Sequence, residues 1–429
     1  MKITVTQYRL LAACAVAAAG TLPAASARAD AVGDFYQGNQ LKIIVGGTAG
    51  GGYAPYARLL QRHMGQYIPG KPNMLIQYMP GAGGLVATNF VANVAPKDGT
   101  VIGAVQRSIV RLALFGDKNA KYDPRNLNWL GSLYSDVSVC VSWHTSGINT
   151  VQDAIERESI IGAISPNNDT GQFPAVLNNI VGTKFKIISG YPGSGGITLA
   201  MARGEVSGRC GWSWLSLKTQ KGEWLRDKKI NVFVQLSLRK LPEIGDVPLA
   251  VDLAKTKEHK QILRFIFAEQ TMGKPFMLPA GVPAERVAAL RKAFMQAARD
   301  EKALSEMKTM KLEVEAMSGE EMETFVAEQL ATPKAVIAAS RDATTYKGPV
   351  AKVKYIKETG RISKIVRGGR ELHMRLADGK TVETSVSGGS TKVFIGGKKA
   401  KGKNVEVGMT CTFDYPGSGY RSRRIDCRR

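Results

Sequence analysis

Histidine and acidic residues are scarce in this sequence. Four histidines occur in 429 residues, and 36 Asp and Glu stand against 59 Lys and Arg, which gives a formal net charge of +23. So few histidines leave little material for a His-centred acid–base or metal site, and we expect no catalytic residue, no metal and no cofactor. The positive charge instead favours a negatively charged partner, such as a small anion or an acidic surface.

The glycine motifs of nucleotide-binding enzymes are also missing. No G-x-x-x-x-G-K-[ST] stretch occurs, and neither Gly46–Gly52 nor Gly81–Val86 fits G-x-G-x-x-G. Pro192 stands where a G-x-S-x-G nucleophile elbow needs its first glycine. We therefore do not expect an enzyme.

Long hydrophobic runs are confined to the N-terminus, and no later run approaches the roughly 20 apolar residues of a membrane helix. A basic start, an Ala-rich apolar stretch over residues 10–22 and the triplet Ala27–Ala29 predict a cleaved signal peptide over residues 1–29. The competing lipoprotein box at residues 11–14 has almost no apolar stretch before it. We expect export to the periplasm, where nucleic acid is not an available partner.

Four cysteines follow this segment, and an even number in an exported chain suggests disulfides. Three pairings exist. The pairs Cys140–Cys210 and Cys411–Cys427 are favoured because each would stay within one domain. The cysteines lack the close Cys/His spacing of a metal site.

Glycine, by contrast, is dense at three places. The stretch LKIIVGGTAGGGYAPYARLL, from Leu41, carries five glycines between a short apolar strand and a helix that begins near Pro55. The same order of strand, glycines and helix recurs twice. The strands are expected at 41–45, 74–78 and 185–188, and the helices that follow the later two at 85–94 and 197–202.

This alternation predicts a parallel α/β sheet. Further strands are expected at 100–105 and 231–236, and further helices at 284–299 and 319–339. Ser318 and Glu321 have the spacing of a capping box for the last helix.

Glycine loops between a strand and a helix favour anion binding. The first N–H groups of a helix are unpaired, the helix dipole adds partial positive charge, and glycine lets a ligand approach the backbone. All three loops would lie at the carboxyl ends of strands, where α/β sheets bind ligands. One such loop could be a simple tight turn, but three favour a site for a carboxylate or phosphate.

The composition changes near Thr344. Residues 346–429 hold 20 Lys/Arg and 7 Asp/Glu, a net +13. Alternating segments at 370–376 and 381–386 flank the hairpin signal Asp378-Gly379, and 392–395 and 409–415 are further strand candidates. We expect a separate basic β-domain, for which a barrel is the simplest arrangement, able to contact an anionic surface.

Several stretches resemble the Bug-type periplasmic receptors of tripartite tricarboxylate transporters. They are GGGYAPYARLL, MPGAGGLVATNFVANVAPKDGTVIG, SGYPGSGG and LPAGVPAERVAALRKAF, in the expected order over residues 41–340. The resemblance implies two α/β lobes around a cleft, the type II periplasmic binding arrangement, with no catalysis. It does not cover the basic tail.

The resemblance also implies the ligand-binding residues. The first loop would bind a carboxylate through Thr48, Ala49 and Gly50, and the second loop through Gly81, Ala82, Gly83 and Gly84. Less specific candidates are Tyr53, Gln106, Asn167, Thr170, Tyr191, Ser194 and Trp214, and Arg107 could pair with a second carboxylate. Family members commonly carry Asp where this chain has Ala54, which favours a plain carboxylate over an amino acid.

We therefore expect a two-lobed α/β binding protein plus a small all-β domain. Lobe 1 is expected over residues 30–135, lobe 2 over 136–250, the completion of lobe 1 and the C-terminal helices over 251–344, and the β-domain over 345–429. The expected function is capture of a small organic acid for a membrane permease. The alternatives are a sensing component that signals to a membrane receptor and a surface-anchored interaction protein.

Overall fold

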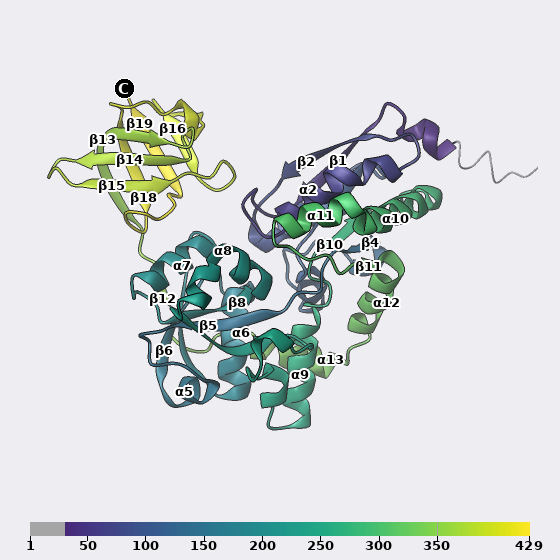
Figure 1. The fold of residues 1–429 in the computed structure, drawn as a ribbon, viewed down its shortest axis with the longest axis horizontal. Helices are drawn as coiled ribbons and strands as arrows, with labels where there is room; N and C mark the ends of the chain where they lie inside the picture. Colours follow the sequence, from purple (N-terminus) through teal and green to yellow (C-terminus); the bar gives the residue numbers. More distant parts are fainter. Residues whose placement is uncertain (1–30, 350) are drawn as a thin grey trace, which may run out of the picture.

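The computed structural model describes residues 31–349 and 351–429. Figure 1 shows two α/β lobes and a small β-domain that sits beside them, at the upper left. The expected signal peptide lies outside the described residues. Within the described ranges, no helix combines the length and apolar character needed to cross a membrane.

Lobe 1 is built on a six-stranded sheet with the order β11-β4-β10-β3-β1-β2. Its strands are β1 (Gln40–Val45), β2 (Asn73–Tyr78), β3 (Val101–Ala104), β4 (Asn128–Ser132), β10 (Pro275–Leu278) and β11 (Met317–Ser318). β1 pairs with β2 and β3 in parallel, as expected. The sheet is nevertheless mixed, because β10 lies antiparallel to β3 and β4 and β11 lies antiparallel to β4.

Helices cover both faces of this sheet. They are α2 (Ala54–His63), α3 (Leu85–Asn93), α4 (Ile109–Leu114), α10 (Ala284–Arg299), α11 (Glu301–Thr309) and α12 (Gly319–Leu330). Successive strand residues point to opposite faces, so Ile43 packs in one core and Ile44 in the other. A strand that is buried on both faces has apolar residues at successive positions, which explains the continuous apolar run in the sequence.

Lobe 2 has a second six-stranded sheet, with the order β12-β7-β6-β8-β5-β9. Its strands are β5 (Ser138–Trp143), β6 (Glu158–Ala163), β7 (Lys184–Ser189), β8 (Gly208–Ser213), β9 (Ile230–Leu236) and β12 (Ala351–Lys352). Its helices are α5 (Val151–Glu156), α6 (Asp169–Val176), α7 (Ser194–Ala202), α8 (Trp214–Arg226), α9 (Lys257–Ala268) and α13 (Lys334–Ala343). The expected disulfide Cys140–Cys210 joins β5 to β8.

Two expectations for residues 251–344 need correction. α9 does not complete lobe 1, because its apolar face, including Leu263 and Ile266, packs in the core of lobe 2. The helix expected over 319–339 is two helices, since α12 ends at Leu330 and α13 starts after Pro333. Proline disfavours helical backbone in the residue before it and lacks the N–H that would continue the helix. The capping box of Ser318 and Glu321 is present.

The C-terminal domain is a seven-stranded sheet with the order β15-β14-β13-β18-β19-β16-β17. The strands are β13 (Ile356–Val366), β14 (Glu371–Leu376), β15 (Thr381–Ser385), β16 (Lys392–Ile395), β17 (Lys398–Ala400), β18 (Thr410–Tyr415) and β19 (Arg424–Arg428). Ser385 at the end of β15 bridges to Arg421 before β19, so the sheet curls back toward itself as in a barrel. The expected disulfide Cys411–Cys427 joins β18 to β19.

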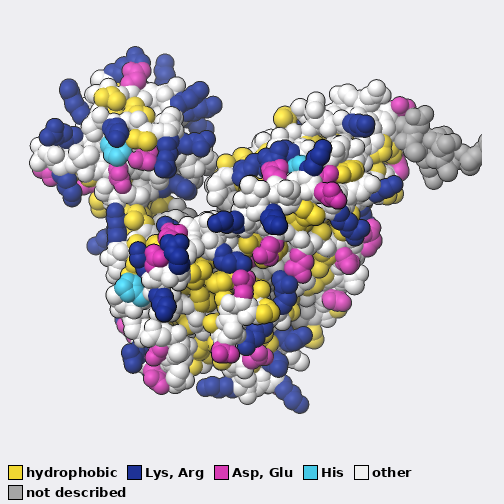
Figure 2. Space-filling model, viewed as in Figure 1, with side chains coloured by type: hydrophobic (Ala, Val, Ile, Leu, Met, Phe, Trp, Pro, Cys, Tyr) yellow, Lys and Arg dark blue, Asp and Glu magenta, His cyan; other side chains and the backbone are white. Residues whose placement is uncertain are grey.

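This domain is attached to lobe 2. β12 extends the lobe 2 sheet by pairing with β7 in parallel, and the Val353 N–H donates to the Ser189 carbonyl. The ring of Tyr420 packs at 6.4 Å from that of Tyr191, and its hydroxyl donates to Glu205. Figure 2 shows Lys and Arg side chains projecting around most of the outline of the domain.

Candidate functional site

The first two glycine loops lie side by side at the carboxyl edge of the lobe 1 sheet, because they follow the paired parallel strands β1 and β2. A Cβ built on Gly46 would lie 3.5 Å from the Gly84 backbone. The Gln106 side chain, from the end of β3, donates to the Gly46 carbonyl at 2.9 Å. The structure therefore brings together the two loops and Gln106 as the sequence predicts.

Both loops present free backbone N–H groups. Among described residues, the N–H groups of Thr48, Ala49 and Gly50 have no backbone acceptor, and neither do those of Ala82 and Gly83. The residues from Ala49 to Gly50 and from Gly81 to Gly83 are exposed. These unpaired donors point to an anionic ligand.

Glycine is needed in the second loop for its backbone shape. Gly81, Gly83 and Gly84 have φ values of 146°, 65° and 98°. Such values are unfavourable for residues with a Cβ, although Ala82 adopts 45° here. The loop thus holds a conformation that costs free energy, as functional loops often do.

A cavity of about 230 Å³ opens beside the first loop, between the lobes. Its lining includes Gly50, Arg58 and Lys274 from lobe 1 and Ser216 and Gln220 from lobe 2, and it contains no Asp or Glu. Arg58 donates to the Ala49 carbonyl at 3.3 Å and so connects α2 to the loop. The charge and the free N–H groups both suit an anion.

Lys274 is held in a buried ionic network between the lobes. Its ammonium lies 3.0 Å from the Asp136 carboxylate and 5.2–5.6 Å from the ring centres of Tyr53, Tyr56 and Tyr134. Burial alone would raise the pKa of Asp136, but the nearby charges of Lys274 and Arg107 outweigh it and lower that pKa. The pKa of Lys274 is lowered, chiefly by burial.

Arg107 links the lobes instead of facing open solvent. Its guanidinium donates to Asp136 and to Asp169, the first residue of α6 in lobe 2. The Tyr53 hydroxyl accepts the Arg107 N–H at 3.2 Å, and burial raises the pKa of Tyr53. Arg107 is therefore already neutralised, and Tyr53 supports the network below the loop.

The candidates in lobe 2 do not line this cavity. The Thr170 hydroxyl is buried and donates to Asn168, and the Trp214 indole is buried and donates to Glu243 at 2.6 Å. Asn167 lines a different cavity of about 330 Å³ beneath β12. Tyr191 is covered by Tyr420, whereas Ser194 is exposed in the third glycine loop.

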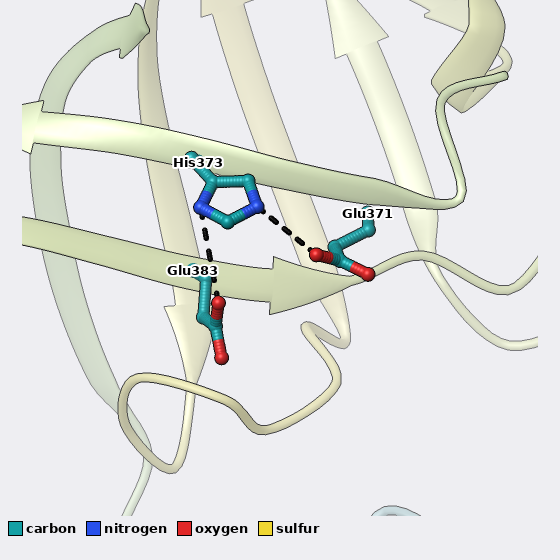
Figure 3. A group of neighbouring side chains, drawn as sticks. All are labelled: Glu371, His373 and Glu383. Carbon is teal, nitrogen blue, oxygen red and sulfur yellow. Dashed lines mark hydrogen bonds and ion pairs between the residues drawn. The ribbon is translucent and has the colours of Figure 1, made fainter. Parts of the chain in front are cut away.

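One other cluster lies in the C-terminal domain. Glu371, His373 and Glu383 have potential ligand atoms within 4.8 Å of one another. Figure 3 shows that the two carboxylates approach opposite ring nitrogens, Nε2 at 3.0 Å and Nδ1 at 3.8 Å. A single ion binds one nitrogen of an imidazole, so this geometry suits a hydrogen-bonded histidine better than a metal centre.

The two lobes match solved structures over nearly the whole length of those proteins. BugD gives a TM-score of 0.54 at 18% identity, covering 72% of this chain and 99% of BugD. A TctC solute-binding protein from Polaromonas gives 0.52 at 17% identity, covering 71% and 99%. This chain has the TctC-type binding-protein fold. An R. palustris protein solved with adipate has the same fold, with a TM-score of 0.55 at 16% identity; the match covers 71% of this chain and 97% of that protein.

No family model and no curated protein matches the sequence. The TctC-type likeness therefore rests on structure, and it shows the fold.

Sequence reasoning missed the charged residues around the cavity. Arg58 stands inside the first glycine motif but reads as an ordinary exposed helix residue. Lys274 interrupts an apolar stretch just before Pro275. A lysine is rarely buried without a charged partner, so its position there could have indicated a buried ion pair. Asp136 and Asp169 gave no local signal, because their partners lie far away along the chain.

Proposed function

We propose that the protein is an exported receptor that binds a small organic acid between its lobes and delivers it to a membrane permease. The observation that carries this proposal is the pair of adjacent loops with free N–H groups, of which the first lines a cavity with two cationic side chains, Arg58 and Lys274. We assign the ligand carboxylate to the N–H groups of Thr48–Gly50 and Ala82–Gly83.

Similar structures support this class of ligand. Proteins of the same fold have been solved with adipate and with malate, both of which carry two carboxylates. Arg58 lines the cavity and provides charge for an acid. The absence of an acidic lining residue disfavours a cationic ligand.

The role in transport is a further part of this proposal. We infer that the bound acid is delivered to a tripartite tricarboxylate-type permease, because the solved proteins of the same fold include TctC-type solute-binding proteins. We assign no catalytic role to any residue of the site and expect no turnover of the bound acid. The periplasm is the proposed location, since the sequence begins with a predicted signal peptide.

A thermal-shift screen tests the proposal directly. The purified protein would be heated with succinate, malate or adipate at constant ionic strength, with adipamide as the uncharged match for adipate. An acid present at 100 times its dissociation constant should add about 2.7 kcal/mol to the free energy of unfolding. Equal shifts with adipate and adipamide, or shifts with sugars or amines alone, would contradict carboxylate recognition.

A further inference from the structure

The third glycine loop forms the N-terminus of α7 in lobe 2. Gly193 precedes the helix with φ of 90°, and Ser194 and Gly195 are exposed. The first N–H groups of a helix have no acceptor within it. A Cβ built on Gly195 meets no described atom within 4 Å, so there is open space at this helix end.

A buried arginine without an acidic partner points at the same place. Arg209, on β8, is 2% exposed, and its guanidinium donates to the Ser194 carbonyl and hydroxyl at 3.3 Å each. Its Nε has no acceptor among the described residues. Burial lowers the pKa of Arg209 to about 9.

A second arginine approaches from the C-terminal domain. The Nη1 of Arg421 lies 3.6 Å from the position of a Cβ on Gly193. It makes a long 3.4 Å contact with Ser390, and its Nε also lacks an acceptor in the described part of the chain. Burial lowers the pKa of Arg421 as well.

Other buried arginines of this protein are neutralised. Arg107 contacts Asp136 and Asp169, and Arg111 contacts Glu269. A buried charge without a counter-charge is unfavourable, because it has lost its hydration. Among the residues that the structure describes, Arg209 has only the Ser194 oxygens and the face of Trp212, 4.4 Å from its guanidinium carbon. Arg421 is partly buried and contacts only Ser390 among them, so neither arginine has the counter-ion that Arg107 and Arg111 possess.

We propose that a doubly charged oxyanion, of the phosphate or sulfate type, binds where Arg209, Arg421 and the N-terminus of α7 meet. The guanidinium groups keep N–H donors beyond those that contact Ser194 and Ser390 and can donate them to such an anion, and the helix N–H groups can donate from the open side. None of these residues lines the inter-lobe cavity beside the first loop. The site joins lobe 2 to the C-terminal domain, so the anion would bind both parts.

Calorimetric titration with inorganic phosphate, in chloride buffer at constant ionic strength, tests the site in the full chain. Wild-type protein should bind phosphate, and Arg209→Gln and Arg421→Gln should each weaken binding about tenfold or more. Arg375→Gln, which removes an exposed arginine from the same domain, should bind like wild type. Arg421 is only partly buried, so that variant serves even if Arg209→Gln does not fold.

Three outcomes would overturn the proposal. The first is the absence of phosphate and sulfate binding to the wild-type protein, the second is equal binding by the wild type and both arginine variants, and the third concerns the first glycine loop. Gly50→Val, which blocks the first loop, should leave phosphate binding unchanged; if it abolishes binding, the first two loops hold the anion instead. Failure of every carboxylic acid in the ligand screen, with phosphate still bound, would refute the proposed function alone.

Discussion

Replacement of Gly50 by alanine separates ligand binding from folding. A Cβ at Gly50 meets no described atom within 4 Å, and the backbone there is not in the left-handed region. At such a position Gly→Ala usually raises stability by about 0.4–1 kcal/mol, because it restricts the unfolded chain. We therefore expect Gly50→Ala to unfold at the same or a slightly higher denaturant concentration than wild type.

Ligand affinity should change in the opposite direction. The added methyl group would occupy the space from which a carboxylate approaches the free N–H groups of the loop. Loss of one hydrogen bond to a charged group costs roughly 1.5–3 kcal/mol. Since each 1.4 kcal/mol is about tenfold in affinity, binding should weaken by about 10- to 150-fold.

Urea unfolding and calorimetric titration of the best acid from the screen provide the two measurements. Gly222→Ala is a matched control, since its Cβ also meets no described atom within 4 Å, but it lies in α8 and does not line the cavity. Gly84→Ala should instead lose stability, because its Cβ would lie 2.3 Å from Gln106 Cγ. If Gly50→Ala binds the acid as tightly as wild type, this loop does not contact the ligand. If Gly50→Ala is much less stable than wild type in urea, the loop geometry is wrong.

Three further predictions concern the charged groups. Lys274→Met should lower the free energy of unfolding by roughly 1.5–3 kcal/mol in urea, because the buried Asp136 carboxylate loses one of its two cationic partners and keeps Arg107, whereas Lys257→Met, at an exposed position, should have little effect. The pKa of Asp136 is lowered from 3.8 in the folded protein, so its contribution is full above that pH and is lost as the pH falls toward the lower folded-state pKa; unfolding measured from about pH 5 down to about pH 2 should show this loss, and Asp136→Asn should flatten it. Binding of the full chain to anionic vesicles should fall between low and physiological salt, as the Debye length shortens to about 8 Å. Replacement of four exposed lysines by Gln should reduce vesicle binding; they are Lys398, Lys399, Lys401 and Lys403. Equal vesicle binding by this variant and the wild type would exclude this surface.

Local patterns predicted the elements around the glycine loops well. The strand from Leu41, the helix after Pro55 and the helix over Ala284–Arg299 needed no distant information, because each has a continuous apolar pattern and a clear start or end. Both disulfides also followed from domain membership alone.

Long-range contacts could not be predicted in the same way. The antiparallel insertion of β10 beside β3 depends on a chain return from lobe 2, and the docking of α9 depends on which core its apolar face meets. Lys274 acquires its role only when three tyrosines from two distant segments, the start of α2 and the turn after β4, converge on it. Hydrophobic periodicity does not contain this information.

The C-terminal domain is connected to one lobe and reaches the other. It continues the lobe 2 sheet through β12, while Gly389 comes so close to Pro80 in the second glycine loop that an added Cβ would lie 3.0 Å from the proline ring. Any rotation of lobe 2 against lobe 1 must carry this domain with it and change the separation of those two residues. The distance between a pair of spin labels near positions 80 and 389 would therefore report changes in the angle between the lobes.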